Sequence, residues 1–224
     1  MTHAIDPAMP LSIGFPPVTV TRYLDQGDGD VATVEVVQSY THAGTHVDAP
    51  FHFIPGAQTV DALHPLALSG SAVVVDLTRL SGWTAVESAD LRMWEDANGE
   101  RIGSGDIVLL RTGHGKLWRH GPEGSAYMTE GWPYLGTSGI DLLLERHIKA
   151  LGVECPDPDK VDQRDLRSAT FEAHHRLLGA GILIIENLAR LGEIPVPRVD
   201  FVALAIPIRG ASGSPIRAIA LVPA

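Results

Sequence analysis

Apolar residues recur along the chain at the spacing typical of strands. Val31 to Tyr40 is rich in β-branched residues and roughly alternates, which predicts a strand. Three shorter apolar runs predict further strands, at residues 72–77, 106–111 and 182–185. The runs 201–208 and 216–222 flank a glycine-containing turn at 210–213, so they predict a hairpin.

A second period, of three to four residues, predicts helices between these strands. Ser88 fits the N-terminal cap of a short helix ahead of Leu91 and Trp94, and residues 139–151 show an apolar stripe. Residues 170–178 predict a third helix ended by glycines, while 121–136 predict a long ordered loop. Strands outnumber helices, which favours a mixed α/β or α+β fold in a single domain over 1–224.

Composition narrows the class of protein further. With 45% hydrophobic and 20% charged residues, the 224-residue chain has the balance of a soluble globular protein. Its formal charge of −10 argues against nucleic acid or an anionic membrane as a partner. Cys155 is the only cysteine and is expected to be a buried structural thiol. No signal-peptide pattern and no apolar run of about 20 residues is present, so we expect a cytoplasmic protein.

Three of the ten histidines lie within eleven residues, together with an aspartate. They are His42, His46 and His52, with Asp48 between the last two. Imidazole and carboxylate groups are ligands of zinc and manganese. His46 and Asp48 are two residues apart, so they should share one face of a strand and leave Val47 to point into the core. This run predicts a divalent metal site.

A second group of candidate ligands lies downstream. Glu186 follows the apolar run 182–185, and a carboxylate at the end of a buried strand is costly without a partner that neutralises it. His174 has apolar neighbours three and four residues away in the predicted helix, whereas His175 neighbours Glu172. We therefore expect His174 to face inward and His175 to face solvent.

The pattern His-x-Gly-Thr-His-x-Asp-x-Pro-x-His at 42–52 resembles the signature of the metal-dependent cyclase family, which includes bacterial kynurenine formamidases and isatin hydrolases. The run from His174 to Leu188, in which His174 lies twelve residues before Glu186, matches the family as well. Weaker matches at 109–113 and 150–159 follow in the family's order. The resemblance implies a swivelling β/β/α fold and a homo-oligomer, a dimer or tetramer.

The resemblance also implies roles for the candidate residues. His42, His46 and Asp48 would bind a first ion, Zn²⁺ or Mn²⁺. Asp48, His174 and Glu186 would hold a second, with Asp48 or Glu186 bridging. One or two ions per chain are therefore expected. His52 lies beyond Pro50, outside this ligand set, where it would act as a general acid or base.

The expected activity is metal-assisted hydrolysis of a small-molecule amide, either an aryl formamide such as N-formylkynurenine or a cyclic amide such as isatin. Two alternatives stay open: a cyclase or dehydratase that uses the same metal as a Lewis acid, and a non-catalytic metal-binding protein. No nucleophile elbow or phosphate-binding loop competes with the metal site. Phe15, Phe53 and Trp118 could line an aromatic pocket, although packing is the favoured role for each, so the substrate-binding residues are unassigned.

Overall fold

The computed structural model describes residues 1–222, and its centre is a sheet that closes into a barrel. Around the barrel the strands follow the order β10-β11-β3-β9-β8-β6-β4. Their bounds are β3 His46–Asp48, β4 Ser69–Asp76, β6 Ile107–Arg111, β8 Ala150–Val153, β9 Leu183–Glu186, β10 Arg198–Ala205 and β11 Gly213–Leu221. The segment β4-β6-β8-β9 is parallel and the remaining pairs are antiparallel.

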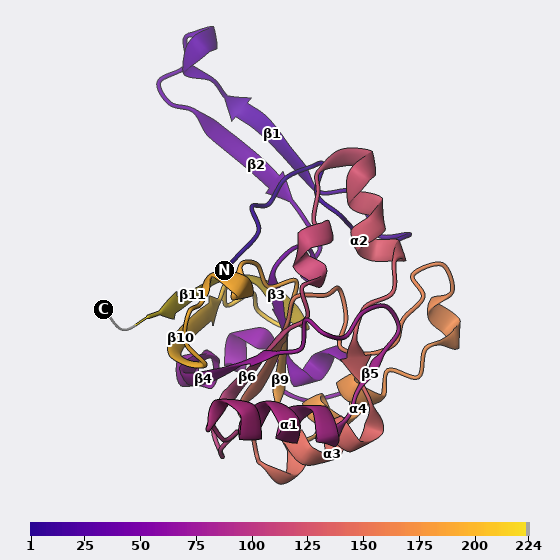
Figure 1. Cartoon of the computed structure of the whole chain (residues 1–224). Helices are drawn as coiled ribbons and strands as arrows, with labels where there is room; N and C mark the ends of the chain where they lie inside the picture. Colours follow the sequence, from indigo (N-terminus) through magenta and orange to yellow (C-terminus); the bar gives the residue numbers. More distant parts are fainter. Residues whose placement is uncertain (223–224) are drawn as a thin grey trace.

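Three helices connect the parallel strands and lie together along one side of the sheet (Figure 1). They are α1 (Ser88–Asn98), α3 (Thr137–Glu145) and α4 (Glu172–Gly179). Alternation along β4 divides the core in two: Val73 and Val75 pack under the helices, whereas Ala72 and Val74 fill the barrel interior. Both faces of the parallel strands are thus buried, which explains why their sequences are nearly continuous apolar runs.

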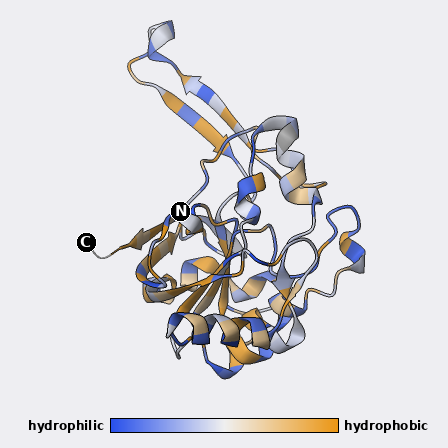
Figure 2. Ribbon diagram, viewed as in Figure 1, coloured by the Kyte–Doolittle hydropathy of each residue, from blue (hydrophilic) through white to orange (hydrophobic). Residues whose placement is uncertain are grey.

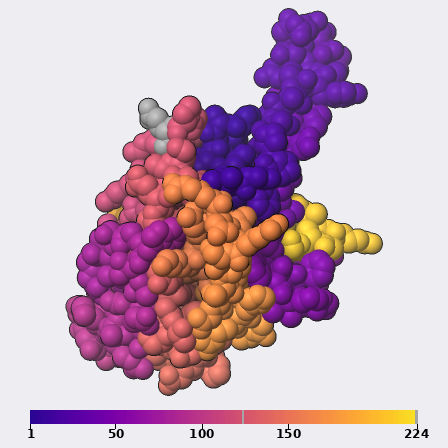
Figure 3. Space-filling model, turned by 90° about the vertical axis from the view of Figure 1, so that its right-hand side faces the viewer, coloured from indigo at the N-terminus to yellow at the C-terminus, as the bar shows by residue number. Residues whose placement is uncertain are grey.

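A two-stranded arm projects from this body (Figures 1 and 3). Its strands β1 (Thr19–Leu24) and β2 (Val34–Gln38) pair antiparallel with each other in a two-stranded sheet. Every residue of β2 is exposed. The predicted strand at 31–40 is therefore confirmed in its central part, but it lies outside the core, and its partner β1 was not predicted.

Two helix predictions need correction. Glu87, and not Ser88, caps α1, because the Glu87 and Asp90 side chains exchange hydrogen bonds with each other's backbone in a capping box. The predicted helix 139–151 ends at Glu145, since His147 adopts a left-handed φ of 50°. The following apolar residues belong to the buried strand β8, whose continuous hydrophobicity imitates an extension of the helical stripe.

The segment 121–136 is more regular than the predicted loop. It contains the short helix α2 (Ser125–Thr129) and the two-residue strand β7 (Tyr134–Leu135), which pairs in parallel with β5 (Ala85–Val86).

The third predicted helix, the strand ending at Glu186 and the β10–β11 hairpin are confirmed, with bounds shifted by one to three residues. The mixed α/β class is confirmed, and the single-domain organisation stays a prediction. Among the residues described, no helix has the length and apolarity to cross a membrane.

Candidate active site

The pairing of β3 with β9 creates the centre of the site. The two strands run antiparallel with His46 opposite Glu186. His46 and Asp48 point to the same side of β3, and Val47 lies in the barrel core, as alternation predicted. Gly44, in the left-handed region with a φ of 64°, bends the chain just before the strand, and Pro50 opens a short 3₁₀ turn just after it.

His46, Asp48, His174 and Glu186 form a compact buried group. His46 Nε2 lies 3.3 Å from both Asp48 Oδ1 and Glu186 Oε2, and His174 Nε2 lies 3.4 Å from both Asp48 Oδ2 and Glu186 Oε1. None of the four side chains is more than 8% exposed. Among the residues that the structure describes, three of their atoms nevertheless have no hydrogen-bond partner, namely His46 Nε2, Asp48 Oδ2 and Glu186 Oε1. Buried polar atoms without partners are unusual, so these converging atoms indicate a site for a ligand that binds all of them.

His42 joins the group from the loop before β3. Its Nδ1 donates to Asp48 Oδ1 at 2.6 Å, and its Nε2 lies 2.8 Å from the hydroxyl of Ser212, in the turn between β10 and β11. Both ring nitrogens thus have protein partners. Gly213 makes room for the ring, because a Cβ there would lie only 2.6 Å from His42 Cε1.

His174 is fixed by two features that the sequence did not reveal. It stands in the first turn of α4, where its ring Nδ1 donates to Asp159 Oδ2 at 2.8 Å. The same carboxylate accepts from the backbone of Ala173 and His174, at 2.7 and 3.1 Å, so it also stabilises the start of the helix. Asp157 Oδ1 lies 3.7 Å from His174 Nδ1. Both aspartates fall within the weak family match at 150–159. That match was the one feature of the sequence that could have indicated their contact with His174.

The charges of the site are unusually concentrated. Burial alone would lower the pKa of His46, but the carboxylates of Asp48 and Glu186 raise that pKa to about 9. Against the opposing effect of burial, His46 and His42 hold the pKa of Asp48 well below its usual value. Burial and the charge of Asp48 together raise the pKa of Glu186. Two carboxylates packed this closely require positive charge between them.

His52 lies beside this group, on the 3₁₀ turn Pro50–His52. Its ring stacks on that of His42, with centroids 3.9 Å apart, and meets the His174 ring edge-on at 5.9 Å. Nitrogen atoms of His42 and His52 and a carboxylate oxygen of Asp48 lie within 4.8 Å of one another. Burial lowers the pKa of His52 to about 4. All six predicted residues are therefore together, and His175 is exposed as expected.

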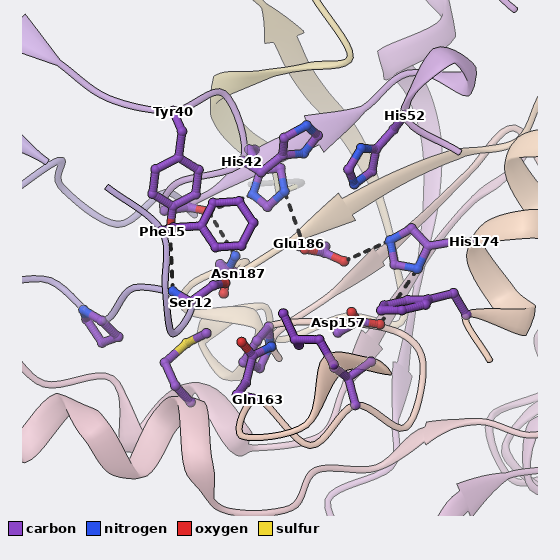
Figure 4. Close-up of a pocket in the computed structure, with 18 of the residues that line it drawn as sticks. Ser12, Phe15, Tyr40, His42, His52, Asp157, Gln163, His174, Glu186 and Asn187 are labelled. Atoms are coloured by element: carbon purple, nitrogen blue, oxygen red, sulfur yellow. Dashed lines mark hydrogen bonds and ion pairs between the residues drawn. The ribbon is translucent and has the colours of Figure 1, made fainter. Parts of the chain in front are cut away.

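A cavity of about 230 Å³ opens onto the site (Figure 4). Phe15 and Phe53 line this cavity. The sequence favoured packing as the role of both rings, but in the structure they also form part of the cavity wall. Trp118 does not line it and instead stacks on His3 and contacts Tyr127. Gln163, in the loop between β8 and α4, also lines the cavity, although nothing in the sequence pattern pointed to it. Cys155 is fully buried nearby and donates to Asp157 O, which agrees with a structural thiol.

Comparisons with known proteins agree with this geometry. The family model described as "Putative cyclase" matches residues 1–160. The kynurenine formamidase of Bacillus cereus (strain ATCC 10987 / NRS 248) is 32% identical over 179 residues, which cover 80% of this chain and 75% of the relative.

Solved structures extend the similarity to the whole fold. An isatin hydrolase bound to the product analogue thioisatinate superposes with a TM-score of 0.86 and 27% identity, covering 100% of this chain and 91% of that one. Isatin hydrolase A from Labrenzia aggregata, bound to benzyl benzoate, gives 0.84 and 26%, with coverage of 99% and 91%. The match over residues 1–160 and the relative at 32% identity show that this chain belongs to the cyclase family.

Proposed function

We propose that the protein is a metal-dependent hydrolase that cleaves the C–N bond of an aryl formamide or a cyclic amide. The observation that carries the proposal is the set of buried, unpartnered atoms of His46, Asp48 and Glu186, which converge beside an aromatic-lined cavity. The kynurenine formamidase and isatin hydrolases to which the chain is similar support this substrate class.

The donor set fits a divalent ion. Imidazole nitrogen and carboxylate oxygen suit zinc and manganese alike, and we propose one of these two metals. His42, His46 and Asp48 would hold a first ion, and Asp48, His174 and Glu186 a second if two are bound. Binding through His42 would replace its present contact with Asp48 or Ser212. Asp159 would act as a positioning residue, because its hydrogen bond fixes the orientation of the His174 ring.

A divalent ion in this place would supply a water of lowered pKa and polarise the substrate carbonyl. The protein's own groups complete the reaction. Phe15 and Phe53 form walls against which an aromatic ring can pack beside the reacting atoms. Burial favours the neutral form of His52, in which one ring nitrogen can accept a proton. His52 would take the proton of the attacking water and pass it to the departing nitrogen.

The two alternatives have less support. A structural metal site is closed by four protein ligands, whereas these side chains open onto a cavity. A cyclase or dehydratase would use the same residues, so product analysis separates it from a hydrolase. The decisive experiment is an assay of metal-reconstituted protein on aryl formamides and cyclic amides side by side, with elemental analysis. Full turnover after exhaustive chelation, in protein that contains no metal, would contradict the mechanism.

We further propose that the protein self-associates through the arm. An isolated two-stranded hairpin is only marginally stable in water. Large apolar side chains are exposed on this one, and Figure 2 shows hydrophobic stretches along its strands: Val20, Tyr23, Val31, Val34, Val36 and Val37. Such a surface requires a partner.

A second copy of the chain offers a complementary surface. The arm, residues 19–38, carries four acidic residues and one arginine. Residues 204–221 also expose large apolar side chains, carry two arginines and contain no acidic residue. The arm of one copy can therefore lie against residues 204–221 of another, with charge and hydrophobicity both matched. A dimer or tetramer is the expected assembly. We also propose that the substrate is a small molecule and that the protein has no nucleic-acid or membrane partner. A cytoplasmic location is proposed as well.

A further inference from the structure

Gln163 has a buried polar atom that the fold leaves unused. The residue is 6% exposed, and its Oε1 atom has no hydrogen-bond partner among the residues described. The residue lines the cavity that also contains His46 and Glu186. Figure 4 shows the Gln163 amide at the edge of that cavity, with no interaction drawn to any neighbouring side chain. A buried carbonyl oxygen without a donor is unfavourable, so its position needs an explanation.

The backbone holds Gln163 in this place. Asp162 forms a tight turn around it: the Asp162 side chain accepts from Arg164 N at 2.9 Å, and the Asp162 carbonyl accepts from Asp165 N at 2.8 Å. On the other side, Val161 is buried in the core beneath the helices. The amide is therefore directed into the cavity by the loop, not by a partner of its own.

Two other polar side chains of the cavity, outside the proposed metal ligands, already have hydrogen-bond partners. The Asn187 amide donates to Gly44 O and accepts from the Tyr127 hydroxyl, and the Tyr40 hydroxyl accepts from Ser12 N. Gln163 Oε1 is an acceptor that remains available, and the apolar walls of the same cavity are the side chains of Phe15, Phe53, Met128, Val161, Leu166 and Phe171.

The cavity also lacks positive side chains. Within the described part of the chain, no lysine or arginine lines it, whereas Asp157 and Glu186 do. Away from the proposed metal ligands, a substrate carboxylate would lose its hydration without gaining a lysine or arginine as a partner.

We infer that Gln163 is a specificity-determining residue: its Oε1 accepts the N–H of an uncharged aromatic amide whose ring packs against the apolar walls. This inference rests on the proposed hydrolase function and narrows its substrate class. Amides without an N–H, and amides that carry a carboxylate, are disfavoured. The role of Gln163 is to recognise and orient the amide before its C–N bond is cleaved.

A double-mutant cycle between protein and substrate tests the inference. Wild type and Gln163→Met, both loaded with metal, are assayed on formanilide and N-methylformanilide, and on isatin and N-methylisatin. We expect wild type to favour the N–H member of each pair by about 10- to 100-fold in kcat/KM, since the methyl group removes the donor. Gln163→Met should reduce this preference to about threefold or less with unchanged metal content. Gln58→Met, at an exposed glutamine outside the cavity, is the matched control.

Charge is tested with 2-formamidobenzoate and its methyl ester, of which wild type should prefer the ester by about 10-fold or more. Calorimetric affinities for acetanilide and N-methylacetanilide repeat the comparison without turnover. Equal N–H preference in wild type and Gln163→Met, in both assays, would overturn the inference. Failure to cleave any amide, combined with a Gln163-dependent difference in affinity, would instead contradict the proposed hydrolysis and leave the recognition role supported.

Discussion

Asp48 contacts histidines from three separate segments of the chain: the loop before β3, β3 itself and α4. Because the carboxylate is fully buried, its charge is balanced only by these rings or by a bound cation. The site is thus constructed so that the order of its side chains depends on positive charge at its centre.

The neighbouring histidines of α4 allow a direct test of ligation. His174→Ala should lose bound metal and activity, because the His174 ring reaches both Asp48 and Glu186. His175→Ala should retain both, since the exposed His175 ring contacts Phe53 and no proposed metal ligand. The measurements are the metal content of each purified variant and its turnover. Equal loss of metal in the two variants would contradict the assignment.

A different outcome is expected at His52. If it transfers protons, His52→Ala should keep its metal and its fold while kcat falls by about 10²- to 10⁴-fold. The reduction should be smaller for substrates whose leaving nitrogen is less basic. Elemental analysis must accompany the kinetics, because loss of metal would make His52 a ligand, and its ring does stack on that of His42. Unchanged turnover would leave it without a catalytic role.

At the scale of elements, the site depends on how closely β11 approaches β3. Gly213 pairs with Asp48 across these strands, and a Cβ at Gly213 would lie 2.6 Å from His42 Cε1 and 2.7 Å from the Val47 carbonyl oxygen. The absence of a side chain on β11 therefore determines where the His42 ring lies.

Gly213→Ala should displace His42 and lower metal affinity by about 10- to 100-fold, the usual effect of disturbing the support of a ligand. Competition with a chromogenic chelator measures the affinity. Gly179→Ala is the control, because a Cβ there meets only Ile54 Cδ1, at an ordinary 3.7 Å. An unchanged affinity in Gly213→Ala would show that His42 is not needed to hold the ion.

At the scale of the whole molecule, the N-terminal segment makes stability depend on pH. His3 stacks on Trp118 with ring centroids 3.8 Å apart, and its buried Nε2 has no hydrogen-bond partner within residues 1–222 as described. Burial lowers the pKa of His3 to about 4 from a usual value of 6.5, and the positive charges of the N-terminal amine and of His120 add to the effect. Because the unfolded chain binds this proton more tightly, stability is complete above pH 6.5 and decreases as pH falls toward 4.

His3→Phe should retain the stacking and remove the titration. Between pH 7 and pH 4.5 the free energy of unfolding of wild type should fall more than that of the variant, by at most about 3 kcal/mol. Urea denaturation at several pH values measures the difference. Parallel pH dependences in the two proteins would rule out His3 as the titrating group.

Assembly is the second property of the whole molecule. Replacing Val36 and Val37 by serine removes apolar surface from the arm without altering its charge, so sedimentation should show a shift from the oligomer toward the monomer. Gln38→Ser, a change of one polar residue for another on the same strand, should leave the assembly intact. A wild-type protein that sediments as a monomer at all concentrations would contradict self-association.

The sequence by itself determined the parts of the site that depend on local periodicity. His46 and Asp48 share a face because side chains alternate along a strand, and His174 turns inward because of its spacing from apolar neighbours in a helix. Glu186 was recognisable as a carboxylate at the end of a buried strand. The family signature added the ligand set, and the fold class followed from the balance of strands and helices.

Tertiary structure alone decided what depends on segments far apart in the chain. Ser212 reaches His42 across 170 residues, and Asp159 reaches His174 through a loop whose path no periodicity encodes. Gln163 lines the cavity because of the path of the loop between β8 and α4, which no local pattern in the sequence specifies. The boundary between α3 and β8 was also beyond local reasoning, because a strand buried on both faces has the same apolar continuity as a buried helix. Periodicity specifies which way a side chain points, and packing specifies what it meets there.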